Sequence, residues 1–337
     1  MQRLKNKILY VLISLFAVCL FFITPANVYA QNSKVYVGGM PAGFTLGIGG
    51  AQIVGICEVL TENGVVSPAK DAELETGDLI VSLGGIKITS AADIDSALSS
   101  YKGGKTVVTA ERKGEKIKRE ISPAKDAASG KYKLGILIRD SISGIGTITY
   151  ITKDGLLFGS LGHSASGSNG NLLRVKGGEI FACTIVNVLK GERGKAGELK
   201  GLFVGEKKIA TAEKNCETGI YGKFEKDYDF SNLKEIEISD RAEPGKASIF
   251  TTVDGMAPKE YSISIIKVDK SNKQNKNFVI KITDKALLKA AGGIVQGMSG
   301  SPIIQNGKLI GAVTHVFLND PTRGYGITVQ NMMKDQT

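Results

Sequence analysis

Short strand-like segments dominate the chain after about residue 133 and constrain its fold more than any other feature. Each is rich in branched and aromatic residues, and turn residues separate it from the next. Closed barrels are a common way to arrange many short strands of this kind. We therefore predict a mostly β fold in which residues 132–337 form a pair of β-barrels. The clearest segments are Ile145–Ile151, Glu179–Leu189, Ala247–Val253, Tyr261–Val268 and Phe278–Ile282.

A separate unit is expected over residues 33–124, before a polar linker of small residues at Ser122–Lys131. Its order of strands, with a helix over Ala91–Ser100 and the run Gly77-Asp78-Leu79-Ile80, resembles a PDZ domain. In PDZ domains the backbone N–H groups of a loop hold the C-terminal carboxylate of a peptide. The matching loop here contains Leu46, Gly47 and Ile48. Gly47 would let the ligand approach while the other two line an apolar pocket; the alternative is a tight turn in a spacer.

The first 30 residues have the pattern of a secretory signal. Arg3, Lys5 and Lys7 form a positive start, the apolar stretch Ile8–Ile23 follows, and Val28-Tyr29-Ala30 offers a cleavage site. The apolar stretch is slightly shorter than the roughly 20 residues of a typical membrane span, yet it could remain as an uncleaved anchor. In either case we expect the remainder of the chain outside the cytoplasm.

Net charge and cysteine content restrict the kinds of ligand and binding partner that we expect. The formal charge is +10, or about +7 without the three basic residues at the start. Outside the cytoplasm such a charge favours an anionic membrane surface or cell-wall polymer, although scattered lysines are also typical of a solvated surface. We expect no nucleic acid partner, because no basic stripe with interleaved aromatic residues is present. Cys57, Cys183 and Cys216 allow either a Cys183–Cys216 disulfide or three thiols, and we expect no metal and no cofactor.

The run Gly297-Met298-Ser299-Gly300-Ser301-Pro302 has the form Gly-x-Ser-Gly-x-Pro, which surrounds the nucleophile of chymotrypsin-like serine proteases. A serine hydroxyl needs a neighbouring base to take its proton. The oxyanion that forms must meet backbone N–H groups that already point at it, and here Gly297 and Ser299 would supply them. The alternative is a plain turn, because Gly, Ser and Pro are ordinary loop residues.

Two histidines, His163 and His315, are the candidates for the base. His163 follows the apolar run Leu157–Leu161 and a glycine, which is typical of a strand that ends in a loop. Loops on a rigid scaffold often carry catalytic groups. His315 lies inside Leu309–Phe317, a predicted strand. We favour His163, and the alternative for either residue is a structural, hydrogen-bonded histidine.

A carboxylate that orients the imidazole completes a triad. Asp284 precedes Ser299 by fifteen residues, whereas Asp154 is nearer to His163 in the sequence. Spacing alone does not choose between the two. Asp284 is also well placed as the N-cap of a helix predicted over Lys285–Ala290, because Asp is a good N-cap residue.

Several stretches resemble the stage IV sporulation protein B (SpoIVB) peptidase family, S55. They are Gly135–Ser141, Gly144–Thr147, Leu161–His163, Ile282–Leu288, Gly292–Lys308 and Gly311–Thr322. The resemblance implies a chymotrypsin-like double β-barrel serine protease domain that follows the PDZ domain. At the matching positions it implies His163 as the base, Asp284 as the orienting acid and Ser299 as the nucleophile.

The resemblance also implies a function. It predicts a sporulation signalling endopeptidase that cleaves a membrane-bound regulator, and also itself, and so activates a later sigma-factor checkpoint. The expected location is the space between the forespore and mother-cell membranes, and the expected partners are protein or peptide substrates and further copies of the chain. The alternatives are a catalytically silent peptide-binding scaffold and a general quality-control serine protease.

Overall fold

The computed structural model describes residues 34–154, 156–165 and 177–336. The predicted signal or anchor over residues 1–30 lies outside the described residues. Of the described residues, 56% lie in strands and 9% in helices, so this part of the chain is mostly β, as predicted. In the part of the chain that is described, no helix has both the length and the apolar character needed to cross a membrane.

Six strands close the first barrel, since each pairs with the next and the last returns to the first. Its interior is apolar and includes Phe44, Ile148, Phe158 and Ile180. In order around the ring the strands are β2 (Pro41–Ile56), β11 (Ile136–Thr152), β12 (Leu157–Ser160), β15 (Gly219–Phe224), β14 (Glu198–Cys216) and β13 (Gly178–Leu189).

The second barrel is also a closed ring of six strands. Phe278, Ile280, Ile303 and Val313 fill its core. Around the ring the strands are β17 (Gly245–Thr251), β18 (Lys259–Val268), β19 (Phe278–Ile282), β22 (Asp320–Thr328), β21 (Lys308–Phe317) and β20 (Pro302–Gln305). Helix α4 (Lys285–Ala291) follows β19. The predicted pair of barrels is therefore confirmed.

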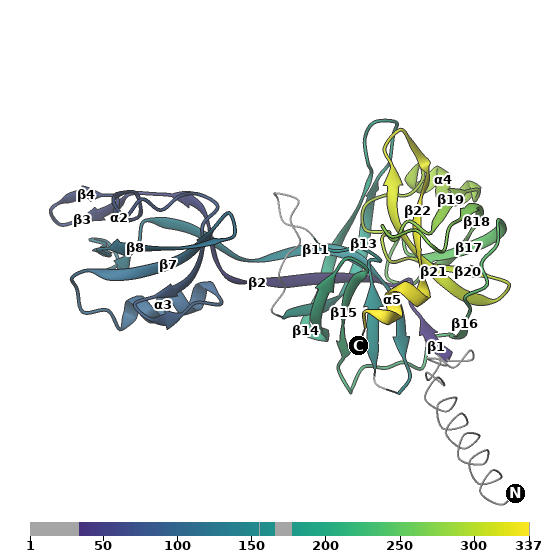
Figure 1. The fold of residues 1–337 in the computed structure, drawn as a ribbon, viewed down its shortest axis with the longest axis horizontal. Helices are drawn as coiled ribbons and strands as arrows, with labels where there is room; N and C mark the ends of the chain where they lie inside the picture. Colours follow the sequence, from purple (N-terminus) through teal and green to yellow (C-terminus); the bar gives the residue numbers. More distant parts are fainter. Residues whose placement is uncertain (1–33, 155, 166–176, 337) are drawn as a thin grey trace, which may run out of the picture. The chain divides into compact units, whose positions relative to one another are not determined.

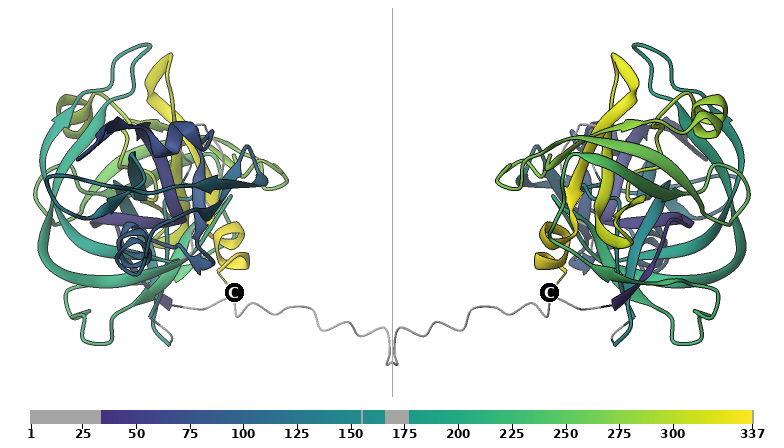
Figure 2. Two further views of the ribbon diagram at one scale, coloured as in Figure 1. Left: turned by 90° about the vertical axis from the view of Figure 1, so that its left-hand side faces the viewer. Right: turned by 90° about the vertical axis from the view of Figure 1, so that its right-hand side faces the viewer.

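Elements from both ends of the chain join the two barrels. Strand β1 (Lys34–Val37) pairs with β11 and with β16 (Glu235–Ile238), and β16 pairs with β21 of the second barrel. The terminal helix α5 (Val329–Lys334), yellow beside the C-terminus in Figure 2, packs Met332 into the same apolar cluster as Val35 and Tyr150. The barrels are thereby tied together by a shared apolar core.

The PDZ unit is built from the residues between β2 and β11 and from the adjoining ends of these two strands. Its core contains Ile80, Ile94, Leu98 and Val108, and helix α3 (Ala91–Ser99) matches the predicted helix to within one residue. The other elements are β3 (Val59–Thr61), β4 (Gly64–Val66), α2 (Pro68–Asp71), β5 (Leu79–Leu83), β6 (Ile86–Lys87), β7 (Thr106–Arg112), β8 (Glu115–Ile121), β9 (Ala124–Lys125) and β10 (Tyr132–Lys133).

The PDZ unit is an insertion within the first barrel, which the expected boundaries at 33–124 and 132–337 did not anticipate. Residues 34–46 pack with the barrel, because β1 pairs with β11 and Phe44 and Leu46 lie in the barrel core. Strands β2 and β11 run antiparallel from the barrel to the PDZ unit, with pairs from Pro41↔Thr147 to Ile56↔Ile136 (Figure 1). A strand placed before the PDZ unit thus completes a barrel whose other strands follow it.

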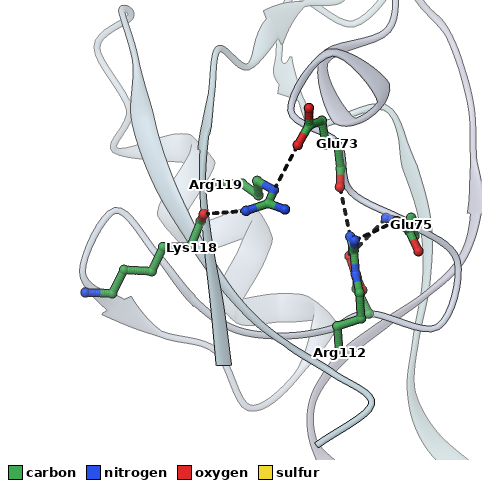
Figure 3. A network of polar contacts seen from close by, with 6 residues as sticks. Glu73, Glu75, Arg112, Lys118 and Arg119 are labelled. Carbon is green, nitrogen blue, oxygen red and sulfur yellow. Dashed lines mark hydrogen bonds and ion pairs between the residues drawn. The ribbon is translucent and has the colours of Figure 1, made fainter. Parts of the chain in front are cut away.

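A buried ion pair fixes the glycine turn before β5. The Asp78 side chain is 1% exposed, and its carboxylate accepts hydrogen bonds from Arg112 Nε at 2.7 Å and Nη2 at 2.8 Å. Arg112 also donates to Glu75 and to the Glu73 carbonyl, and Arg119 reaches the Glu73 carboxylate (Figure 3). Burial raises the pKa of Asp78, but the bonds from Arg112 and the Glu75 N–H outweigh it and leave that pKa below its ordinary value.

Candidate active site

The Ser299 loop is a tight turn that only glycine permits at two positions. Gly297 and Gly300 have φ values of 96° and 94°, in the left-handed region that other residues rarely adopt. A Cβ on Gly300 would lie 2.1 Å from the Thr147 carbonyl oxygen. The two glycines therefore let the chain fold closely against β11 and present Ser299 at the turn.

Two threonines of β11 hold the carbonyl groups of this loop. The Thr147 N–H donates to the Ser299 carbonyl at 3.1 Å, and Thr147 Oγ1 donates to the Gly297 carbonyl at 2.8 Å. Thr149 Oγ1 donates to the Gly300 carbonyl at 2.7 Å. Both threonines are buried, so their geometry is fixed by packing. This arrangement directs the carbonyl groups toward the first barrel.

The N–H groups of Gly297 and Ser299 remain available. Among the described residues they donate no hydrogen bond, whereas the N–H groups of Met298 and Gly300 donate to Val295 at 3.1 Å and Val313 at 2.8 Å. An oxyanion hole requires backbone donors that are already placed and not otherwise engaged. Within the described ranges, the two N–H groups that the sequence assigned to an oxyanion hole therefore have no hydrogen-bond acceptor.

Ser299 and His163 line one cavity of about 940 Å³ that Gly297 and His315 also line. The Ser299 hydroxyl donates to the Thr314 carbonyl at 2.6 Å. No hydrogen bond joins Ser299 to His163 within the described residues. Catalytic hydrogen bonds are often absent or long before substrate binds, so a rotation of the hydroxyl is needed to bring it to the imidazole.

The contact of His163 with the backbone sets its tautomer. His163 Nδ1 lies 2.8 Å from the Ser164 carbonyl oxygen. Because a carbonyl can only accept, Nδ1 carries the proton and Nε2 keeps a free lone pair in the neutral ring. Burial lowers the pKa of His163, and the bond to Ser164 opposes only part of that shift. The imidazole is therefore neutral at neutral pH and able to accept a proton at Nε2.

His315 packs beside His163. Their ring centroids are 4.8 Å apart with an interplanar angle of 38°. Burial first, then the nearby His163 and Lys276, lower the pKa of His315 to about 4. A base of such low pKa is poorly matched to neutral conditions. The cavity thus contains both histidines weighed from the sequence.

Asp284 is not among the residues that line this cavity. Its carboxylate caps helix α4 by accepting from the N–H groups of Ala286 at 2.9 Å and Leu287 at 3.0 Å, and it also contacts the Ser262 N–H at 3.4 Å. Asp154, the other acid considered, lies in the turn after β11 and does not line the cavity either. The structure thus brings Ser299 and His163 together and directs Asp284 to the helix cap.

The expected carboxylate loop of the PDZ unit is instead part of a strand. Leu46 pairs with Ile142 of β11 and Gly178 of β13 and is 3% exposed. The Gly47 N–H already donates to the Gly177 carbonyl at 3.0 Å, and Ile48 belongs to the same strand, β2. The assignment is therefore corrected, because a donor engaged in the sheet cannot hold a peptide carboxylate.

A second Leu-Gly-Ile sequence, Leu134–Ile136, lies at the PDZ end of β11. It enters the part of β11 that pairs with β2 along one edge only, among the described strands, and that contacts helix α3. Gly135 has φ of 72°, and the Ala91 N–H at the start of α3 donates to Asp140 at 2.8 Å. The tripeptide Leu-Gly-Ile occurs twice in the sequence, at residues 46–48 and 134–136. We predicted the peptide-binding loop at the first copy and overlooked the second.

The described residues contain no disulfide and no cluster of metal-ligand side chains. Cys57, Cys183 and Cys216 are free thiols. Across the described ranges, no three His, Cys, Asp or Glu side chains gather as metal ligands would.

The two six-stranded barrels form the double-barrel architecture of chymotrypsin-like peptidases. A serine and a neutral histidine line one cavity of this fold. The family model described as SpoIVB peptidase S55 matches residues 130–333, and a PDZ domain model matches residues 54–122. The chain belongs to the SpoIVB peptidase S55 family and is a protease.

Curated relatives match a short part of the chain. The protein named "Putative zinc metalloprotease SA1105" of Staphylococcus aureus (strain N315) is 39% identical over 75 residues, which are 20% of this chain and 18% of that protein. The protein named "Putative zinc metalloprotease SAR1238" of strain MRSA252 is 37% identical over the same length and shares. The chain thus spans about a fifth of the length of these relatives.

Proposed function

We propose that the protein is a serine endopeptidase in which Ser299 is the nucleophile and His163 the general base. The observation that carries the proposal is the placement of Ser299 and His163 on one cavity, with the His163 ring held by a backbone carbonyl. His163 Nε2 is free to accept while Nδ1 is held by the Ser164 carbonyl at 2.8 Å, and Ser299 lines the same cavity beside two unused N–H donors.

The reaction follows from these positions. Ser299 Oγ attacks the carbonyl carbon of the scissile peptide bond as His163 Nε2 takes the hydroxyl proton. The N–H groups of Gly297 and Ser299 stabilise the oxyanion of the tetrahedral intermediate. His163 then gives its proton to the leaving amine, the C–N bond breaks, and an acyl-enzyme remains. A water molecule, deprotonated by His163, hydrolyses the ester and restores the Ser299 hydroxyl.

Asp284 is retained as the proposed orienting acid on the strength of the family resemblance, although its carboxylate caps α4 in the structure. Asp284→Asn separates the two roles, because Asn is also a good N-cap. A kcat lower by about 10⁴-fold, as expected when a triad imidazole loses its acid, would support the orienting role. An unchanged kcat would leave Asp284 as a cap and Ser164 as the group that orients His163.

The PDZ unit supplies protein or peptide recognition. The free edge of β11 beside α3 can accept an added strand, which is how PDZ domains bind an extended peptide. The substrate is proposed to be a membrane-bound regulator of sporulation, cleaved outside the cytoplasm between the forespore and mother-cell membranes, with self-cleavage and self-association in addition. This part rests on the family resemblance and on the signal-like sequence at the N-terminus. Protease protection of the chain in sporulating cells tests the location.

Hydrolysis of an unstructured protein substrate by wild type, Ser299→Ala and Ser301→Ala tests the catalytic assignment. Ser301 is the comparison residue, because it lies two residues away in the same loop and its buried hydroxyl donates to the Met298 carbonyl at 2.6 Å, with Thr251 Oγ1 2.9 Å away. We expect complete loss of cleavage, and of labelling by a fluorophosphonate probe, in Ser299→Ala, whereas Ser301→Ala should keep both at a reduced rate because its hydroxyl holds the Met298 carbonyl. Equal cleavage by wild type and Ser299→Ala would reject the nucleophile. Wild type that binds peptides but neither cleaves nor reacts would indicate a silent scaffold.

A further inference from the structure

One wall of the cavity is basic and comes from the second barrel. The loop between β18 and β19 contributes Lys273, Gln274, Asn275 and Lys276 to the lining beside Ser299. Lys276 also lines the adjoining cavity of about 270 Å³, where its Nζ lies 5.1 Å from the centroid of the Tyr325 ring. Lys276 and Gln274 therefore line both cavities, whereas Lys273 lines the larger one, with Ser299.

Hydrogen bonds fix the shape of this loop. Asn272 Oδ1 accepts from the N–H groups of Gln274 at 3.0 Å and Lys276 at 3.1 Å. Asn331 of helix α5 donates to Asn275 at 3.1 Å and to Asn277 at 3.2 Å. The backbone that carries both lysines is thus held in place before any ligand binds, which lowers the entropic cost of binding.

The charges of the lysines are not neutralised by the protein. The lysine and arginine ion pairs of the second barrel join Lys308 to Glu237 and Arg323 to Asp320. Among the described residues no carboxylate forms an ion pair with Lys273 or Lys276. Glu217, from the first barrel, is the acidic residue of the larger lining, and Asp269 lines the smaller cavity together with Lys276.

We propose that the loop Lys273–Lys276 is a specificity subsite that selects a peptide with an acidic side chain next to the scissile bond. The proposal rests on the proposed peptidase function and adds the chemical class of its substrate. A carboxylate held between the two ammonium groups would form charge-assisted hydrogen bonds. The methylene groups of the same acidic residue would contact the Tyr325 ring and the apolar stems of the lysines.

Cleavage of a set of matched peptides tests the selection directly. The peptides carry Asp, Asn, Lys or Leu at each position within two residues of one cleavable bond, and both ends are blocked so that the PDZ unit has no free C-terminus to bind. We expect kcat/KM to be about tenfold higher for Asp than for Asn at one position. Lys276→Glu should reverse the preference toward Lys. The exposed Lys289 on α4 gives a matched control in the same barrel, so Lys289→Glu should keep the wild-type order.

Binding to the inert Ser299→Ala protein tests the subsite independently of catalysis. Fluorescence anisotropy should show tighter binding of the blocked Asp peptide than of the Asn peptide, and the difference should shrink with added salt because screened charges interact weakly. Equal affinities and equal kcat/KM for the Asp and Asn peptides would overturn the subsite while leaving Ser299 labelling intact. If wild type is neither labelled nor active but the inert protein still binds the Asp peptide more tightly than the Asn peptide, the peptidase mechanism alone would be overturned. A preference confined to peptides with a free C-terminus would assign the carboxylate to the chain end and contradict the proposal.

Discussion

Thr147→Val removes one hydrogen bond from the Ser299 loop and little else. Thr147 is 1% exposed, and its hydroxyl donates to the Gly297 carbonyl at 2.8 Å. Valine has nearly the same shape, and the backbone bond from Thr147 N–H to Ser299 is unaffected. The Gly297 carbonyl then lacks its donor, which should lower the free energy of unfolding by about 1–2 kcal/mol.

The same change should weaken catalysis more than substrate binding. Without its anchor, the peptide unit of Gly297 loses the orientation that presents neighbouring N–H groups to the oxyanion. Loss of a whole oxyanion donor costs about 10²–10³-fold in kcat, so a loosened donor should cost about 10- to 100-fold with KM little changed. Thr147→Ser restores the hydroxyl and should recover most of kcat.

A remote threonine gives the control for this experiment. Thr252 is buried and its hydroxyl donates to the Gly39 carbonyl at 3.0 Å, away from the cavity. Thr252→Val should cost similar stability, measured by denaturant unfolding, but leave kcat on a chromogenic peptide unchanged. Wild-type kcat in Thr147→Val, with the expected loss of stability, would refute the positioning role of Thr147.

Three further predictions concern pH, the PDZ ion pair and the PDZ groove. Burial lowers the pKa of His163, so its neutral form persists below the ordinary pKa of about 6.5. We therefore expect kcat/KM to be constant from neutral pH down to about 6.5 and to fall only below that pH. A half-maximal kcat/KM above about pH 7 would contradict this prediction. Arg112→Met should destabilise the PDZ unit by about 3 kcal/mol, because it leaves Asp78 buried without its partner, as measured by hydrogen exchange of β5. Since the folded pKa of Asp78 is depressed, its stabilisation is present above about pH 3.9 and is lost as pH falls through the folded value. Ile138 lies on the part of β11 that pairs with β2 near the PDZ unit and is partly buried against the PDZ core. Ile138→Thr should weaken binding of a peptide with a free apolar C-terminus about tenfold, whereas Gly47→Ala should not; the reverse result would restore the first Leu-Gly-Ile site.

The barrels were predictable because strand signals are local. Segments such as Phe278–Ile282 carry branched and aromatic residues between turn residues, and the structure places β19 over the same range. The helix after Asp284 followed equally well from its cap and was found at Lys285–Ala291. What the sequence did not reveal is which strand pairs with which, because pairing depends on contacts between residues far apart in the chain.

The site was partly predictable for the same reason. The Gly-x-Ser-Gly turn is a local pattern, and with only two histidines in the chain the search for a base was short. Thr147 and Thr149 escaped notice because nothing in their own neighbourhood marks a hydroxyl that will bond a carbonyl about 150 residues away. The Leu46-Gly47-Ile48 assignment failed because a tripeptide cannot show whether its N–H groups are already engaged in a sheet.

The insertion of the PDZ unit between β2 and β11 has a consequence for the order in which the chain folds. The PDZ core forms mainly between residues close in sequence, whereas β2 must wait for β11 and β13 before the first barrel can close. Contacts between near residues form first, because closing a long loop costs entropy. Pairs such as Ile56↔Ile136 belong to the PDZ end of the ribbon, so a folded PDZ unit already holds the ends of β2 and β11 together. We therefore expect the PDZ unit to nucleate closure of the first barrel, so that deleting it should slow barrel folding even where the remaining strands are intact.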